Sequence, residues 1–103
     1  MVTVIVQFKL PSPISQEKAR ELFLASAPNY QKITGLLRKF YLLGEDGCSA
    51  GGVYIWESKS AAEKLFDAEW KQFIRDKYNA EAEVSYFFSP VQVDNLTGEI
   101  ISD

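Results

Sequence analysis

Tyr54 and Trp56 are the residues of this chain whose types and spacing best suit chemistry. They stand two positions apart in a segment that begins Ala50-Gly51-Gly52 and has the pattern of a strand, so their side chains share one face. The hydroxyl of Tyr and the indole N–H of Trp donate hydrogen bonds while their rings stack on an aromatic molecule. Glycine in a strand costs stability and is most useful where something approaches the backbone closely. The segment therefore predicts one wall of a small pocket.

Apolar and aromatic residues from three parts of the chain are expected to surround that wall and to contact a bound molecule. The substrate-binding candidates are Gly52, Phe66, Trp70, Phe73 and Tyr86. Trp70 and Phe73 also fit the apolar stripe of a helix, where such residues are more often core than site. Fourteen per cent of the chain is aromatic, and a chain of 103 residues has little interior to hide so many rings. This excess favours either a cavity for an apolar or aromatic ligand or an interface between subunits.

The composition excludes several classes of chemistry. The chain has no histidine, which removes the commonest general base and the commonest ligand of zinc and haem iron. Its one cysteine, Cys48, forms no disulfide within the chain and fits a reducing cytoplasm. No carboxylate spacing is typical of a calcium loop, so we expect neither a metal nor a cofactor.

Charge and hydropathy also limit the partners. The net charge is −3, and the densest basic pair is Arg38-Lys39, which is too little for a surface that binds nucleic acid or an anionic membrane. No signal peptide opens the chain, and no apolar stretch is long enough to span a bilayer. We therefore expect a cytoplasmic protein with no nucleic-acid and no membrane partner.

Hydrophobic periodicity gives the elements that must position these residues. Alternation predicts strands, and spacings of three and four predict helices. The expected strands are 2–10, 36–43, 49–56 and 82–93, and Pro90 should place the far half of the last one at an edge or outside the sheet.

Ser15 is expected to cap the first helix, and Ser60 or Ser58 the second. Pro28 should end or kink the first helix, or open a new turn after it. Asp67 is placed to cap a further helix, so the stretch that ends at Asn79 is one helix or two abutting ones.

The order of these elements is β-α-β-β-α-β, which is typical of an α+β, ferredoxin-like fold with a four-stranded antiparallel sheet and helices on one face. Residues 1–95 are expected to form this single domain, and residues 96–103 a C-terminal tail. Strands one, two and four carry bulky apolar residues on both faces, although helices cover only one. A second copy of the sheet is the simplest cover for the other face, so we expect a homodimer.

Four segments carry a family resemblance: residues 35–41, 50–56, 58–65 and 84–91. Together they resemble the YdhR-like monooxygenase family, and the resemblance extends over residues 8–95. The most specific part is the Ala-Gly-Gly-Val-Tyr core of residues 50–54. The family belongs to the dimeric α+β barrel superfamily, so the resemblance implies that fold, a homodimer and an oxidoreductase activity.

The superfamily includes haem-degrading enzymes and cofactor-free oxygenases that act on polyketide-like aromatic molecules. The resemblance matches Trp56 to a Trp at the exit of the third strand, whereas the histidine of the haem degraders falls near Arg75, so haem degradation is disfavoured. In the cofactor-free enzymes, Asn, Trp, Tyr and Arg side chains orient a phenol and stabilise its anion. By residue type, Asn29, Arg38, Tyr54 and Trp56 are therefore the catalytic candidates.

Three functions stay open at this point. The first is a cofactor-independent monooxygenase that binds a small aromatic or polyketide-like molecule between sheet and helices. The second is a non-catalytic ligand-binding or stress-response dimer, which the lack of histidine and of an evident general base favours. The third is an interaction domain whose aromatic residues fill a dimer core and leave no pocket.

Overall fold

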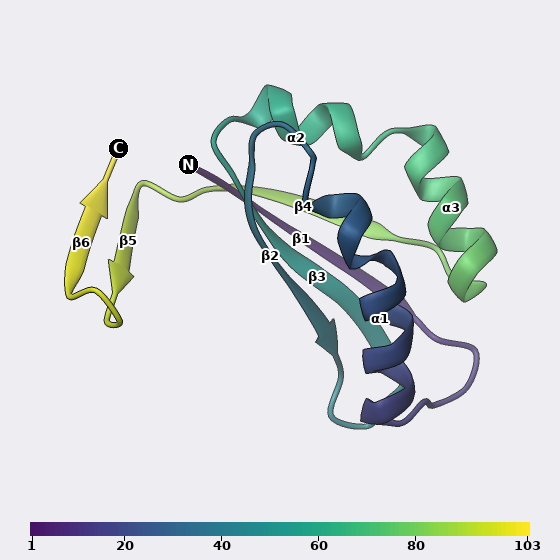
Figure 1. Cartoon of the computed structure of the whole chain (residues 1–103). Coiled ribbons are helices and arrows are strands. Elements are labelled where there is room, and N and C mark those ends of the chain that lie inside the picture. The colour runs from purple at the N-terminus through teal and green to yellow at the C-terminus, as the bar shows by residue number, and fades with distance from the viewer.

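Four antiparallel strands form the central layer of the structure, a computed structural model that describes residues 1–103 (Figure 1). The chain runs through β1 (Val2–Lys9), α1 (Gln16–Tyr30), β2 (Leu36–Leu43), β3 (Ser49–Trp56), α2 (Lys59–Leu65), α3 (Ala68–Tyr78), β4 (Glu83–Phe88), β5 (Val91–Asp94) and β6 (Glu99–Ser102). The large sheet has the order β2-β3-β1-β4, and β5 pairs only with β6. This order and the helices on one face confirm the α+β, ferredoxin-like class.

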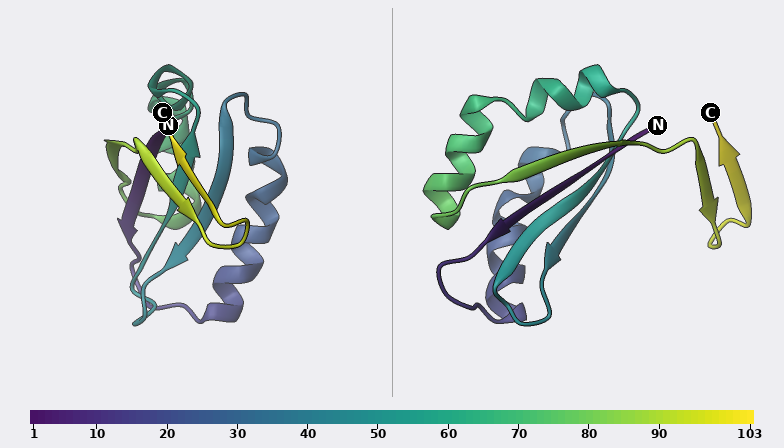
Figure 2. Two further views of the ribbon diagram at one scale, coloured as in Figure 1. Left: turned by 90° about the vertical axis from the view of Figure 1, so that its left-hand side faces the viewer. Right: turned by 180° about the vertical axis from the view of Figure 1, so that it is seen from behind.

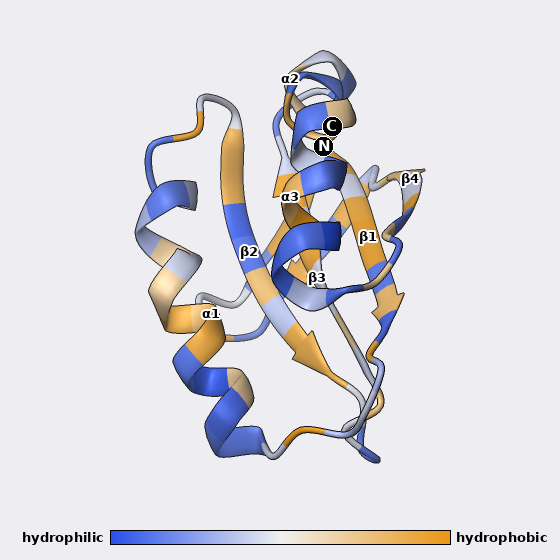
Figure 3. Cartoon of the chain, turned by 90° about the vertical axis from the view of Figure 1, so that its right-hand side faces the viewer, coloured by the Kyte–Doolittle hydropathy of each residue, from blue (hydrophilic) through white to orange (hydrophobic).

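The register of the sheet decides which side chains meet the helices. Val4 pairs with Tyr54 on one side and with Tyr86 on the other, and all three side chains point to the helix face. Along β1, every second residue from Val2 to Phe8 is buried. Figure 3 shows most of this strand as hydrophobic and α1 lying beside β2. The core therefore lies between the sheet and the three helices.

Caps fix the three helices. The side chains of Ser15, Ser58 and Asp67 accept hydrogen bonds from the backbone N–H groups of the first turns of α1, α2 and α3. The second helical stretch is thus two helices, with Asp67 as the cap between them. Asn79 ends α3 in the left-handed conformation, with φ at 52°. None of the helices is long and apolar enough to cross a membrane.

Pro28 does not end α1, which was one of the outcomes that the sequence allowed. The helix continues through Pro28 and ends at Tyr30. Proline lacks the N–H that would bond to the carbonyl four residues before it, and its ring clashes with that carbonyl. Because the helix ends soon after Pro28, the disturbance is confined to its last turn.

The chain after β4 leaves the sheet. Pro90, which has no N–H, lies between β4 and β5, so the far half of the strand expected over 82–93 leaves the sheet as the sequence indicated. The segment that follows folds back as the β5–β6 hairpin, which stands away from the sheet (Figure 2). Residues 96–103, expected as a tail, thus include a strand, β6.

The sheet face opposite the helices is partly apolar and lies open in the single chain. Phe40, Leu42 and Phe87 point to this face and are exposed, and Ile5 and Ile55 lie between them. The hairpin adds exposed apolar side chains, which are Val91, Val93, Leu96, Ile100 and Ile101. Exposed apolar surface of this kind marks a contact with another molecule.

Candidate functional site

Tyr54 and Trp56 lie side by side on β3 and face the helices. Their rings stack with centroids 6.4 Å apart, and Trp56 is 0% exposed. The ring of Phe66 stands edge-on to both, at 4.9 Å from Tyr54 and 5.8 Å from Trp56. The structure therefore brings these three residues together as one packed aromatic cluster.

The indole N–H of Trp56 has no hydrogen-bond partner, although it is fully buried. Leaving a buried donor unpaired costs about 1–3 kcal/mol. Such groups are rare in folded proteins, and each one calls for an explanation. Trp56 therefore holds a donor that another group could use if it reached the cluster.

The expected substrate-binding residues surround this cluster unevenly. Phe66 packs at 4.8 Å from Trp70 and 6.3 Å from Tyr86, so these rings are in contact. The indole N–H of Trp70 donates to the hydroxyl of Tyr30 at 3.1 Å. Phe73 is 42% exposed and lies at the rim of the core on α3.

Gly52 and Gly51 are glycines for two different reasons. A Cβ at Gly52 would lie 3.1 Å from Cε1 of Tyr54, so the missing side chain leaves room for that ring. A Cβ at Gly51 would overlap the backbone carbonyl oxygen of Val6 on β1. These glycines let the strands and the Tyr54 ring approach closely, as the sequence predicted.

The structure does not bring Asn29 and Arg38 to this cluster. Asn29 is exposed on the last turn of α1. Arg38 pairs with Ile55 and points to the sheet face opposite the helices. Side chains alternate along a strand, so the register that turns Lys39 inward turns Arg38 outward.

Lys39 is the functional candidate that the sequence reasoning missed. It pairs with Tyr54 in the sheet. Its Nζ lies 3.3 Å from the ring centroid of Tyr30, 3.8 Å from that of Tyr41 and 4.6 Å from that of Tyr54. The alternation of side chains along β2 puts Lys39 and Tyr41 on the same face. A lysine that shares a strand face with a tyrosine is the feature of the sequence from which this candidate could have been predicted.

Burial and the nearby Lys77 lower the pKa of Lys39 to about 6. No carboxylate forms an ion pair with it; the three pairs in the chain join Met1 to Asp103, Lys18 to Glu21 and Arg75 to Glu81. An ammonium ion removed from water without a counter-charge is costly, so the neutral amine is favoured. At neutral pH, Lys39 therefore carries a free lone pair.

The tyrosines around Lys39 keep their protons. Burial is the main cause that raises the pKa of Tyr54 far above its usual value, and it also raises the pKa of Tyr41. The hydroxyls of Tyr41 and Ser26 are hydrogen-bonded at 2.7 Å, and Phe23 stacks on Tyr41 at 4.7 Å. These hydroxyls are suited to donating hydrogen bonds, not to accepting a proton.

The space between sheet and helices is nearly full. One interior cavity of about 20 Å³ lies beside Lys39, Tyr41 and Tyr54, which is room for about one water molecule. Trp70, Lys77 and Tyr78 of α3 also line it. An aromatic molecule does not fit there unless side chains move.

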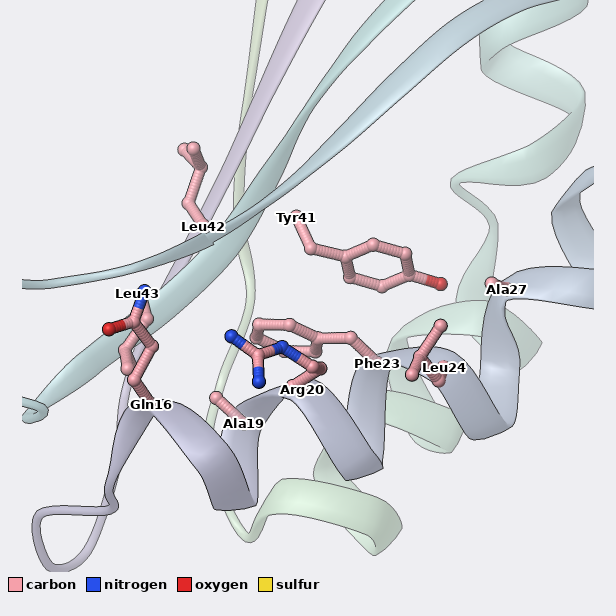
Figure 4. Close-up of a pocket in the computed structure, with 9 residues that line it drawn as sticks. All are labelled: Gln16, Ala19, Arg20, Phe23, Leu24, Ala27, Tyr41, Leu42 and Leu43. Atoms are coloured by element: carbon pink, nitrogen blue, oxygen red, sulfur yellow. The ribbon is translucent and has the colours of Figure 1, made fainter.

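Larger hollows lie along the groove between α1 and β2. One of 470 Å³ is lined by Gln16, Ala19, Arg20, Phe23, Leu24, Ala27, Tyr41, Leu42 and Leu43 (Figure 4). A second, of 360 Å³, is lined by residues that include Tyr30, Lys39 and Tyr41. Tyr41 borders both hollows and the interior cavity, so it separates the groove from the core.

Polar contacts hold α1 over this boundary. The ammonium group of Lys77 donates to the carbonyl oxygen of Leu22 at 3.2 Å, and Tyr41 bonds to Ser26. The pKa of Lys77 is lowered by burial. Few α1 side chains are fully buried, namely Ala19 and Ser26. The helix is thus attached mainly by a few hydrogen bonds and the rings of Phe23 and Tyr30.

No group of three or more His, Cys, Asp or Glu side chains lies close enough to hold a metal ion. Chemistry at this site would be carried out by the amine, the hydroxyls and the indole N–H groups described above. Together these groups can bind an aromatic ring, accept one proton and stabilise an oxyanion.

No family model matches the chain, and no curated protein matches it. Solved structures do. The chain is similar to SnoaB, a cofactor-independent oxygenase from Streptomyces nogalater, with 16% identity, a TM-score of 0.62, and 85% of this chain and 91% of that one covered.

Two further structures are similar. The ActVA-Orf6 monooxygenase of Streptomyces coelicolor, solved with Nanaomycin D, has 19% identity and a TM-score of 0.65, with 85% of this chain and 86% of that one covered. Rv0793 from Mycobacterium tuberculosis has 11% identity and a TM-score of 0.63, with 91% and 100% covered. At these identities the likeness establishes the fold alone.

Proposed function

We propose that this protein is a cofactor-independent monooxygenase that acts on a small hydroxylated aromatic or polyketide-like molecule. The observation that carries the proposal is the group of rings and hydroxyls around Lys39, namely Tyr30, Tyr41 and Tyr54, with the indole N–H of Trp70 donating to Tyr30. The fold shared with SnoaB and the resemblance of residues 8–95 to the YdhR-like monooxygenase family also support it.

Oxygenation without a cofactor needs a substrate whose anion reacts directly with dioxygen. The protein has to bind the ring, favour the anion and keep water out. Tyr54 supplies a hydroxyl that stays protonated, and Trp56 supplies an unpaired N–H behind it. Tyr54 lines the interior cavity and is suited to stabilising negative charge on a bound oxygen, whereas Trp56 does not line it and would do so only after side chains move.

We propose that the substrate enters through the groove between α1 and β2. The groove has the volume that the interior lacks, and Tyr41 lies at the boundary between the two. If the Tyr41 ring turned and α1 lifted, two hydrogen bonds would break: the one between the hydroxyls of Tyr41 and Ser26, and the one from Lys77 to the carbonyl oxygen of Leu22. Each hydrogen bond contributes about 1 kcal/mol, and the opening would also separate Leu22, Phe23 and Tyr30 of α1 from the core.

We also propose that the protein is a homodimer whose sheets pack face to face. Phe40, Leu42 and Phe87 leave an apolar area on the sheet that no helix covers. Sedimentation at micromolar concentration should give the mass of two chains, and Phe40→Glu should shift it to one. A wild-type mass of one chain would contradict the dimer.

A non-catalytic ligand-binding dimer is the second candidate, and the 470 Å³ hollow favours it, because its lining includes neither Lys39 nor Tyr54 nor Trp56. It predicts saturable binding of an apolar molecule in the α1–β2 groove with no turnover. The oxygen-uptake experiment described next distinguishes this candidate from the oxygenase.

The test is oxygen uptake with a panel of anthrones and hydroquinones, with the methyl ether of each compound as a control that has no ionisable hydroxyl. We expect uptake with the free phenols, none with the ethers, and a lower rate in Tyr54→Phe and Trp56→Phe. Uptake no faster than in buffer would rule out the oxygenase. Saturable binding without uptake would support the second candidate.

A further inference from the structure

Lys39 stands between the interior cavity and the groove, because it lines both the 20 Å³ cavity and the 360 Å³ hollow. Its amine lies over the rings of Tyr30 from α1 and Tyr41 from its own strand. A molecule that entered the groove and displaced the Tyr41 ring would therefore meet this amine first.

The groups that face Lys39 lack negative charge. They are Tyr30 from α1, Tyr41 from β2, Tyr54 from β3, and Lys77 and Tyr78 from α3. Burial raises the pKa of Tyr78 to about 12, so this hydroxyl is also neutral near pH 7. The site thus holds the amines of two lysines and the hydroxyls of four tyrosines. A bound anion would supply the negative charge that a protonated lysine lacks there.

We propose that Lys39 is the general base of this site and takes the proton of a phenolic or enolic hydroxyl. This inference rests on the proposed function. The O–H bond of the substrate breaks, its electron pair stays on oxygen, and the proton forms a bond to Nζ. The neutral amine and neutral phenol thus become an ammonium–phenolate pair, and no net charge enters the site.

The surroundings favour this pair once it has formed. The ammonium ion lies over aromatic faces, which attract cations. Tyr54, whose ring centroid lies 4.6 Å from Nζ, lines the same cavity, and its hydroxyl would donate a hydrogen bond to the phenolate. The phenolate then gives electrons to dioxygen, the oxidant: one oxygen atom enters a ring carbon as a carbonyl, and the other leaves as water with the one hydrogen of that carbon and the proton held on Nζ, which returns the amine to its neutral form.

Lys77 is a poorer base, although it lines the same cavity. Its Nζ already donates to the carbonyl oxygen of Leu22, which fixes it between α3 and α1. Nζ of Lys39 makes no hydrogen bond to protein. A pKa of about 6 also leaves Lys39 deprotonated at neutral pH and close to the value at which a base works best there.

The test follows the ionisation of bound para-nitrophenol, whose anion absorbs visible light, together with proton release into a weak buffer. In wild type near pH 6.5, below the pKa of the free phenol, we expect the bound phenol to ionise with little proton release, since Nζ keeps the proton. Lys39→Met should bind the phenol in its neutral form. Lys39→Arg, a permanent cation, should release about one proton for each phenol that ionises.

Lys71→Met is the matched control, because Lys71 is an exposed lysine on α3 outside the cavity. It should behave as wild type. Equal ionisation in Lys39→Met, full proton release in wild type, or failure of the phenol to bind would each overturn the inference.

Oxygen uptake separates this inference from the proposed function. With an oxidisable hydroquinone, we expect Lys39→Met to lose on the order of 100-fold in rate. Ionisation of the phenol without any oxygen uptake would refute the oxygenase and keep Lys39 as the base. Uptake that is unchanged in Lys39→Met would refute the base and keep the oxygenase.

Discussion

Replacing Lys39 with methionine should make the protein more stable, and the gain should shrink as the pH rises. Methionine keeps most of the packing volume of the lysine stem and removes the amine. The folded protein lowers the pKa of this amine from 10.5 to about 6, so below pH 10.5 folding has to desolvate or deprotonate it.

The sign follows from the protons bound in each state. Below about pH 6 both states hold the proton, and the folded state bears the full cost of the buried charge. Between about 6 and 10.5 the unfolded state holds a proton that the folded state lacks, so wild-type stability rises with pH by up to about 1.4 kcal/mol per pH unit. Above 10.5 the cost is gone.

The size of the effect follows from the same pKa. At pH 7 the cost corresponds to the interval between pH 7 and the ordinary pKa of 10.5, which is about 5 kcal/mol. Lys39 keeps some contact with water, which relieves part of this cost, so we expect Lys39→Met to gain about 2–3 kcal/mol at pH 7 and about 1 kcal/mol at pH 9. For a domain of this size, 2 kcal/mol is a large share of the total stability.

Urea unfolding of wild type, Lys39→Met and the control Lys71→Met at pH 6, 7, 8 and 9 measures this difference. Other titrating groups are common to the three proteins and cancel in the comparison. A loss of stability in Lys39→Met, or a gain that does not change between pH 7 and 9, would refute the electrostatic account of this site.

Three further outcomes are expected in urea unfolding at pH 7. Gly51→Ala should lose about 3 kcal/mol or more, because its Cβ meets the carbonyl of Val6; a loss below 1 kcal/mol would contradict the close approach. Asp67→Ala should lose about 1 kcal/mol, because the N–H of Trp70 loses its acceptor, and Asp67→Asn should recover most of it. Trp56→Phe should change stability by less than about 1.5 kcal/mol, since removal of an unpaired donor offsets the cavity left behind; a loss above 3 kcal/mol would mean that this N–H has a partner.

The fold was predictable because local and long-range signals agree. Alternation along residues 36–43 and 49–56 gave β2 and β3 with the bounds that the structure has. Asp67 and Asn79, residue types that favour helix ends, marked the start and end of α3. Pro28 left the end of the first helix open, because a proline indicates a nearby helix end without fixing the residue, and α1 ends at Tyr30.

The site was only partly predictable. That Tyr54 and Trp56 lie on the same face of β3 follows from strand periodicity alone. The role proposed for Lys39 depends on the residues of α1 and α3 that pack over it. Their position is decided by how these helices pack on the sheet, which strand periodicity does not predict. Arg38 was the candidate for stabilising an anion by its residue type. In the structure it points to the opposite sheet face from its neighbour Lys39, because successive side chains of a strand point in opposite directions.

The position of β1 has a consequence for how the chain folds. It precedes the other strands of the sheet in the chain, yet it lies in the interior of the sheet and pairs with β3 and with β4, which ends at Phe88. Contacts between residues so distant in sequence slow folding, because the entropy of closing a long loop is lost before the stabilising contacts form. During synthesis, Val2, Val4 and Val6 are therefore made before the strands that cover them, and β1 is open to association with other chains until β3 and β4 follow.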